Sequence, residues 1–91
     1  MTARVWRIEF HRAAVRDLHR LGAEGERRVL RYLRERIAGS ADPRRFGRAL
    51  ADDRKGLWRY RIGDYRIVAA IEDDRFVVLV VVVGHRREVY R

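Results

Sequence analysis

Apolar and polar residues alternate near the start of the chain, between residues 5 and 10. Side chains along a β-strand point to opposite faces in turn, so Trp6, Ile8 and Phe10 share one face and the residues between them share the other. This pattern predicts a half-buried strand, which we expect at an edge of a sheet.

From about residue 12 the apolar residues recur every three or four positions, which is the period of an amphipathic helix. Ala14, Leu18 and Leu21 define a short helix that ends at Gly22, because glycine is common just past a helix C-terminus. A second helix is expected over about residues 24–38. Its apolar stripe consists of Val29, Leu30, Leu33 and Ile37. We expect the two helices to form a hairpin over one face of the sheet.

A β-hairpin is predicted over residues 57–68, where two alternating runs flank the dipeptide Gly63-Asp64. Glycine as the first of two turn residues suits a type II′ turn, which connects neighbouring antiparallel strands. Such a turn fixes the register of the hairpin and places Ile62 opposite Tyr65.

The register of this hairpin gathers arginines on one face. Arg61 lies opposite Arg66, and Arg59 follows on the same face two residues away. Like charges directly opposite each other destabilise a sheet, so we expect the fold to use them to bind an anion, most simply a phosphate. The alternative is a passive surface that contacts phosphate or protein.

Residues 76–83 are apolar at every position, which is typical of a central strand covered on both faces. Residues 44–56 form a basic connection into the hairpin, with Phe46 and Leu50 as its expected anchors to the core. The element order is β-α-α-β-β-β within a single domain, residues 1–91. This order predicts an α+β fold in which a helical hairpin packs on a small antiparallel sheet.

The end of the central strand leads toward the arginine face. A two-residue turn at Asp73-Asp74 places Arg66 opposite Val81, and strict alternation then puts His85 on the arginine face. A bulge at Gly84 would reverse this alternation for the residues that follow. Both arrangements bring further candidates close to the arginine face. These candidates are His85, Arg86 and Tyr90.

The formal net charge is +9, from 22 basic and 13 acidic residues, and every basic residue except Lys55 is an arginine. The excess is spread over both halves of the chain, which excludes a basic tail and indicates a basic folded surface. Such a surface favours a polyanion or an acidic protein as the partner. A solvated charged surface without a partner is the alternative.

The sequence contains no cysteine, which excludes disulfides, cysteine-ligated zinc and a thiol nucleophile. Its three histidines, His11, His19 and His85, lack metal-ligand spacing, so we expect no metal ion and no other cofactor. No apolar run reaches the roughly 18–20 residues that span a membrane, and no signal peptide is recognised. The expected location is therefore the cytoplasm.

These residue types suit cleavage of a phosphodiester without a metal. RNA supplies its own nucleophile, the 2′-hydroxyl, so the protein needs to align it, stabilise phosphoryl charge and move protons. Arginine is a poor proton carrier because its pKa exceeds about 12, which leaves Tyr90 or His85 for that role. Neighbouring arginines are expected to lower the pKa of Tyr90. Alternatively, Tyr90 is an aromatic that packs over the core.

Two blocks of the chain carry a resemblance to a known family. They are residues 55–68, with the sequence KGLWRYRIGDYRIV, and residues 83–90, with the sequence VGHRREVY. Together with Leu50 and the N-terminal strand and helices, they resemble the RelE branch of the RelE/ParE toxin superfamily. The resemblance covers nearly the whole chain. It implies a microbial RNase fold and a toxin that a small antitoxin wraps and silences.

The resemblance also implies a role for each residue that matches a motif position. Arg59 and Arg61 match a basic pair on the first hairpin strand, and Arg66 matches the arginine that holds the scissile phosphate. Arg86 matches an arginine that stabilises the leaving group or the phosphate. Tyr90 matches the tyrosine that orients or activates the nucleophile.

Other positions in the two blocks are expected to contact RNA, or differ from the pattern of the family. Lys55 and Arg87 are expected to bind RNA phosphates together with Arg59, Arg61 and Arg66. The best-known RelE proteins have lysines where this chain has Arg59 and Arg61, which weakens the case for a lysine-based proton relay. His85 stands where the family is often basic, and it is an alternative acid or base.

The leading hypothesis is a metal-independent, ribosome-dependent mRNA endonuclease of a type II toxin–antitoxin system. RelE-like toxins cut mRNA in the ribosomal A site and leave a 2′,3′-cyclic phosphate. The expected partners are mRNA on the ribosome and a cognate antitoxin with an acidic, amphipathic segment, in a hetero-oligomeric complex. One alternative is a ParE-like toxin that poisons DNA gyrase without nuclease activity. Another is a decayed toxin that only binds nucleic acid or a partner.

Overall fold

The helices and strands expected from the sequence are present in the computed structural model, which describes residues 5–50 and 56–85. The described elements are β1 (Arg7–Phe10), α1 (Arg12–Arg20), α2 (Gly22–Tyr32), the π-helical turn η1 (Leu33–Ile37), the 3-10 helix η2 (Pro43–Phe46), β2 (Arg48–Ala49), β3 (Leu57–Ile62), β4 (Tyr65–Glu72) and β5 (Val77–His85). No helix in the described ranges is long and apolar enough to cross a membrane.

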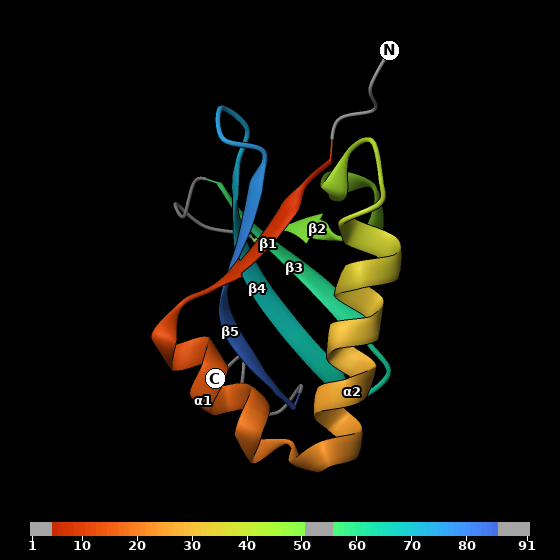
Figure 1. Ribbon diagram of the computed structural model, residues 1–91, viewed down its shortest axis with the longest axis vertical. Coiled ribbons are helices and arrows are strands. Elements are labelled where there is room, and N and C mark those ends of the chain that lie inside the picture. Colours follow the sequence, from red (N-terminus) through yellow and green to blue (C-terminus); the bar gives the residue numbers. More distant parts are fainter. Residues whose placement is uncertain (1–4, 51–55, 86–91) are drawn as a thin grey trace.

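The strands form one five-stranded sheet in the order β1-β5-β4-β3-β2. Both helices cover the same face of this sheet, as Figure 1 shows, with α1 against β5 and α2 against β3. The α+β fold with a helical hairpin on a mostly antiparallel sheet is therefore confirmed. One pairing differs from the expected antiparallel sheet, because β1 at the edge runs parallel to β5. The short strand β2 was not expected from the sequence.

The helices bury the apolar stripes that their sequences predict. Ala14 and Leu18 of α1 are buried, and Val29, Leu33 and Ile37 of the second helix are 0–1% exposed. The second helix continues through η1, where the amide of Ala38 donates to the carbonyl of Leu33 at 2.8 Å. The predicted helical hairpin is confirmed, and its last turn is wider than an α-helical turn.

The hairpin of β3 and β4 has the predicted register. Ile62 lies opposite Tyr65, and Arg61 lies opposite Arg66. Gly63 has φ +58°, the left-handed conformation that a type II′ turn requires at its first central residue. Because this turn joins adjacent strands, its sequence alone specifies the pairing.

The pairing of β4 with β5 differs from the prediction. Arg66 lies opposite Gly84, so the predicted pairing with Val81 is wrong by three residues. Two of the three come from the connection, because Glu72 pairs with Val77 and the turn therefore has four residues instead of two. The third comes from a bulge between Val68 and Ala69 of β4, opposite which β5 carries an extra residue.

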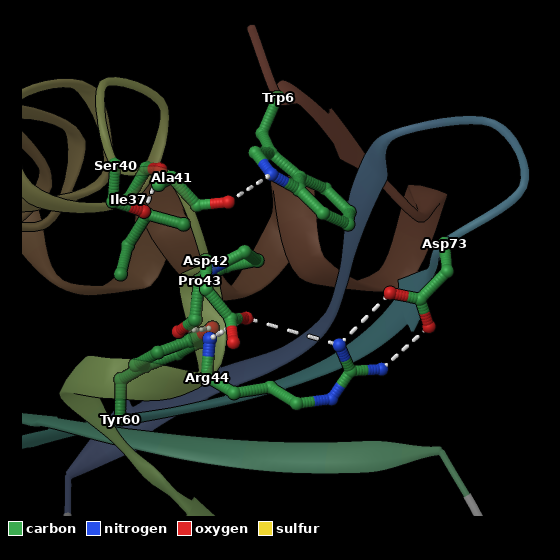
Figure 2. A network of polar contacts seen from close by, with 9 residues as sticks. All are labelled: Trp6, Ile37, Ser40, Ala41, Asp42, Pro43, Arg44, Tyr60 and Asp73. Carbon is green, nitrogen blue, oxygen red and sulfur yellow. Dashed lines mark hydrogen bonds and ion pairs between the residues drawn. The ribbon is translucent and has the colours of Figure 1, made fainter. Parts of the chain in front are cut away.

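A polar network fixes η2 and the segment before it against three parts of the fold (Figure 2). The buried hydroxyl of Tyr60 in β3 donates to the carbonyl of Pro43 at 2.8 Å. The indole nitrogen of Trp6, before β1, donates to the carbonyl of Ala41 at 3.3 Å. Arg44 makes a bidentate bond to Asp73 in the β4–β5 turn, with distances of 2.9 and 2.7 Å.

The Arg44–Asp73 pair makes stability depend on pH. The guanidinium of Arg44 lowers the pKa of Asp73, and the carboxylate in turn raises the pKa of Arg44. Because the folded-state pKa of Asp73 is lowered, the pair stabilises the fold above the ordinary aspartate pKa of about 3.9. That contribution is lost as the pH falls through the lowered pKa.

We predict that Asp73→Asn lowers the free energy of unfolding at neutral pH by no more than about 1 kcal/mol, because the pair is partly exposed. Urea titrations at a series of pH values measure this loss, and the variant should lose less stability on acidification than the wild type. Asp74→Asn is the matched control, since it removes the same charge from the same turn. Equal acid dependence in the wild type and Asp73→Asn would contradict the prediction.

Candidate active site

The sheet face opposite the helices carries a group of arginines from three neighbouring strands. Arg61 of β3 lies opposite Arg66 of β4, and Arg48 of β2 lies opposite Arg59 of β3. Directly opposed residues share a face, and Arg59 and Arg61 are two positions apart on one strand. The predicted face of Arg59, Arg61 and Arg66 is therefore confirmed, and Arg48 extends it by one strand.

These side chains line a groove of about 580 Å³. The lining residues are Arg45, Phe46, Gly47, Arg48, Arg59, Tyr60, Arg61 and Arg66. The described lining thus carries five positive charges and no carboxylate. A groove of one sign concentrates the field of its charges and attracts an anionic ligand.

Arg66 is held in a fixed orientation at the base of this face. Its side chain is only 7% exposed, and Nη1 donates to the carbonyls of Gly63 at 2.8 Å and Tyr65 at 3.0 Å. Within the described ranges, no carboxylate forms an ion pair with this guanidinium. The residue opposite is Gly84, which has no side chain to occupy the space beside it. A charged, oriented donor of this kind suits an oxyanion.

Sequence reasoning missed Arg45 and Arg48, because residues 44–56 were treated as an irregular connection. A strand of two residues has no periodicity from which its register can be read. Gly47 was the one feature of the sequence that could have indicated a close approach between this segment and another strand. A Cβ atom at Gly47 would collide with the carbonyl oxygen of Arg59 and lie 2.7 Å from the indole of Trp58. Glycine therefore allows β2 to pair closely with β3.

Two tyrosines near the groove are unsuited to accept a proton at neutral pH. Burial raises the pKa of Tyr60 well above its ordinary range, and its hydroxyl is engaged with Pro43. Burial likewise raises the pKa of Tyr32, although Arg36 partly opposes the shift. Both hydroxyls stay protonated at neutral pH, so neither is available as a general base.

His85 does not lie on the arginine face, where strict alternation had placed it. It lies opposite Tyr65, which pairs with the buried Ile62 on the helix side of the sheet. The rings of His85 and Tyr65 are 5.2 Å apart between centroids. The cause is the register shift within β5, since the bulge reverses which residues face the arginines.

Four predicted site residues lie outside the described residues, so their positions stay predictions. They are Lys55, Arg86, Arg87 and Tyr90. Within the described ranges, no three His, Asp or Glu side chains form a cluster suited to hold a metal ion. The described site is thus an arginine groove with one buried, oriented guanidinium.

The sequence is similar to known toxins over most of its length. Residues 8–90 match the family described as the ParE toxin of type II toxin–antitoxin system, parDE. Toxin RelG of Mycobacterium tuberculosis is 34% identical over 86 residues, which covers 92% of this chain and 94% of the relative. Toxin RelE of the same organism is 33% identical over 78 residues, covering 86% of this chain and 78% of the relative.

Solved structures give the same result. The toxin–antitoxin complex RelBE2 from Mycobacterium tuberculosis contains a chain with TM-score 0.82 and 26% identity, covering 96% of this chain and 98% of that one. A chain of the archaeal RelE–RelB complex from Pyrococcus horikoshii has TM-score 0.73 and 25% identity, covering 93% and 99%. The isolated RelE toxin of Escherichia coli, at 22% identity and TM-score 0.69 over 93% and 90%, shares the fold. The chain therefore belongs to the RelE/ParE toxin family of type II toxin–antitoxin systems.

Proposed function

We propose that this toxin is an endoribonuclease that cleaves mRNA on the ribosome without a metal ion. The observation that carries the proposal is the arginine groove, which brings Arg59, Arg61 and Arg66 onto one face with no carboxylate in its described lining. The two curated relatives named RelG and RelE support the same branch of the family. The reaction would take place in the cytoplasm, where mRNA is translated.

The proposed reaction uses the 2′-hydroxyl of the substrate as the nucleophile. Its oxygen bonds to the adjacent phosphorus while the bond from phosphorus to the 5′-oxygen breaks, which leaves a 2′,3′-cyclic phosphate and a free 5′-hydroxyl. One proton leaves the 2′-hydroxyl and one is delivered to the 5′-oxygen. Negative charge grows on the phosphoryl oxygens in between, and groups fixed in advance stabilise it most effectively.

The described residues supply charge stabilisation and alignment. The buried guanidinium of Arg66 is already oriented by two backbone carbonyls, so little free energy is needed to reorient it when the phosphate binds. Arg61 lies directly opposite and exposed, and Arg59 continues the face along β3. We propose that these three hold the scissile phosphate, with Lys55 and Arg87 as further phosphate contacts.

The proton carrier is proposed from the motif. Guanidinium groups with a pKa above about 12 exchange protons poorly. Tyr60 is unsuitable because its buried hydroxyl already donates to the carbonyl of Pro43. Tyr90 is the proposed carrier, and Arg86 would stabilise the leaving group or the phosphate. His85 is the alternative carrier, but its side of the sheet makes it the weaker choice.

A second function is favoured by one observation, the match to the family described as ParE toxin. A toxin of that branch would bind and inhibit DNA gyrase and would need no cleavage site. The oriented Arg66 in an arginine groove has no evident use in such a protein. This difference makes the nuclease the first choice.

We also propose that a cognate antitoxin neutralises this toxin in a hetero-oligomeric complex. The similar structures from Mycobacterium tuberculosis and Pyrococcus horikoshii are both described as toxin–antitoxin complexes. The net charge of +9 favours an antitoxin with an acidic, amphipathic segment, laid on the basic face or over the helical hairpin.

Arg61→Ala is expected to lower the rate of mRNA cleavage about 100-fold, because it removes one donor that stabilises the transition-state charge. Arg66→Ala and Tyr90→Phe should also reduce cleavage, with thermal melts to confirm that each variant folds. Primer extension on messages from translating ribosomes measures the cuts. Arg34→Ala is the matched control, since it removes the same charge from the exposed surface of η1.

Equal cleavage by the wild type, Arg61→Ala, Arg66→Ala and Tyr90→Phe would refute the assigned roles. The gyrase alternative predicts a different result. Purified toxin would then inhibit DNA supercoiling while the message stays intact, and the arginine variants would leave the message equally intact.

The antitoxin complex should weaken with salt if charge pairs dominate its interface. We expect the dissociation constant to rise more than about tenfold between roughly 0.1 and 0.5 M NaCl, because exposed charges are screened. Surface plasmon resonance with the separately purified antitoxin measures this dependence. An affinity that does not change with salt would indicate an apolar interface and contradict the prediction.

A further inference from the structure

One wall of the arginine groove is built from η2 and β2, apart from the residues proposed to hold the scissile phosphate. This wall contributes Arg45, Phe46 and Arg48 to the lining. We propose that it is a binding subsite for the nucleotide next to the cleaved bond, in which Arg48 contacts a second phosphate and Phe46 stacks on a base. This inference rests on the proposed RNA substrate and adds where a second nucleotide binds.

The separation of the arginines indicates more than one phosphate. Arg48 is on β2, Arg59 and Arg61 are on β3, and Arg66 is on β4. Neighbouring strands are about 4.8 Å apart, so the backbones that carry Arg48 and Arg66 are separated by roughly 10 Å. A phosphate held by Arg66 is therefore two strands away from Arg48. A single-stranded chain that crosses these strands can place successive phosphates against both residues.

Phe46 offers an aromatic surface for a base, a contact that the arginines do not provide to the phosphates. Its side chain is half-buried and packs against the core, and its remaining surface lines the groove. The guanidinium of Arg45 lies 6.0 Å from the centre of its ring. Aromatic rings beside arginines are the surfaces on which proteins stack unpaired bases. An acidic peptide would use the arginines of this wall but would gain no stacking from Phe46.

The wall is fixed before a ligand arrives. Pro43, at the start of η2, accepts the bond from Tyr60, and Arg44 is bound to Asp73 (Figure 2). The carbonyl of Phe46 accepts a bond from the hydroxyl of Tyr32 at 3.4 Å. A subsite that is already ordered loses less entropy when it binds, which favours a specific ligand over a diffuse charge contact.

The test uses the full-length toxin and an RNA of about six nucleotides with 2′-O-methyl groups, so that binding is measured without the nucleophile. A second RNA has the same backbone but abasic residues in place of its bases. Fluorescence anisotropy over a series of salt concentrations gives the affinity and its salt dependence for both. The proteins are the wild type, Arg48→Ala, Phe46→Leu, Arg61→Ala and the control Arg34→Ala. Phe46→Leu keeps an apolar side chain against the core, and thermal melts check that each variant folds.

Arg48→Ala is expected to reduce the slope of log affinity against log salt by about 0.7, the value for one phosphate contact on a single strand. In the wild type the bases should improve affinity about tenfold over the abasic RNA, and Phe46→Leu should remove most of that gain. Arg34→Ala should change neither quantity.

Three results would overturn the subsite. In the first, Arg48→Ala shows the same salt dependence of affinity as the control Arg34→Ala. In the second, Phe46→Leu still binds the RNA with bases as much more tightly than the abasic RNA as the wild type is expected to do. In the third, the wild type binds both RNAs with equal affinity. Equal affinity for both RNAs would mean that the wall binds anions in general, and an acidic peptide would then bind there as well. Arg61→Ala separates this failure from that of the proposed function. A weakened Arg61→Ala with an unchanged Arg48→Ala refutes the subsite alone, whereas unchanged affinity in both refutes the RNA groove as well.

Discussion

The alternation of side chains along β3 is the constraint on which both sides of the molecule depend. Tyr60 points into the core, where its hydroxyl binds the carbonyl of Pro43 and holds η2 in place. Arg59 and Arg61, its neighbours in sequence, must then point to the opposite face. A shift of one residue in this strand would bury two guanidinium groups and expose an aromatic ring. The buried tyrosine and its neighbours thus specify the register that creates the groove.

The groove also depends on the way β4 and β5 are paired. The bulge near Val68 and the four-residue turn together bring Gly84 opposite Arg66. Glycine leaves room beside the buried guanidinium, whereas the predicted partner, Val81, would have placed a branched side chain there. The same shift carries His85 to the helix side of the sheet. The irregular part of the sheet therefore decides which residues have access to the candidate phosphate site.

Sequence reasoning was most successful where interactions are local. The turn at Gly63 determined the pairing of Arg61 with Arg66, and the helical period identified the buried stripe that includes Val29 and Leu33. It was wrong for the β4–β5 register. One residue of the error is the bulge, which no pattern marks because residues 80–83 are all valine and a shift of one residue places an identical side chain at each position. The turn before β5 was also expected to be too short. Its last residue, Phe76, has φ +54°, a conformation that usually favours glycine, so its residue type gives no indication of a turn longer than two residues.

Contacts between distant segments were also missed. The parallel pairing of β1 with β5 and the pairing of Arg48 with Arg59 join segments that no local pattern connects. As a result, the sequence identified three arginines of the site but not the wall of η2 and β2. Strand geometry brought Arg86 and Tyr90 into the neighbourhood of these arginines, and the resemblance to RelE toxins supplied the roles expected of them.

The central claim is that this arginine groove cleaves RNA by using the substrate's own 2′-hydroxyl. The most direct measurement is the cleavage, on translating ribosomes, of a message in which one nucleotide at the mapped cut carries a 2′-deoxyribose. The account predicts that this single substitution abolishes the cut, while the unmodified message yields a fragment that ends in a 2′,3′-cyclic phosphate. Cleavage of the deoxy-substituted message at the original rate would show that water or a protein group attacks instead, and would contradict the account.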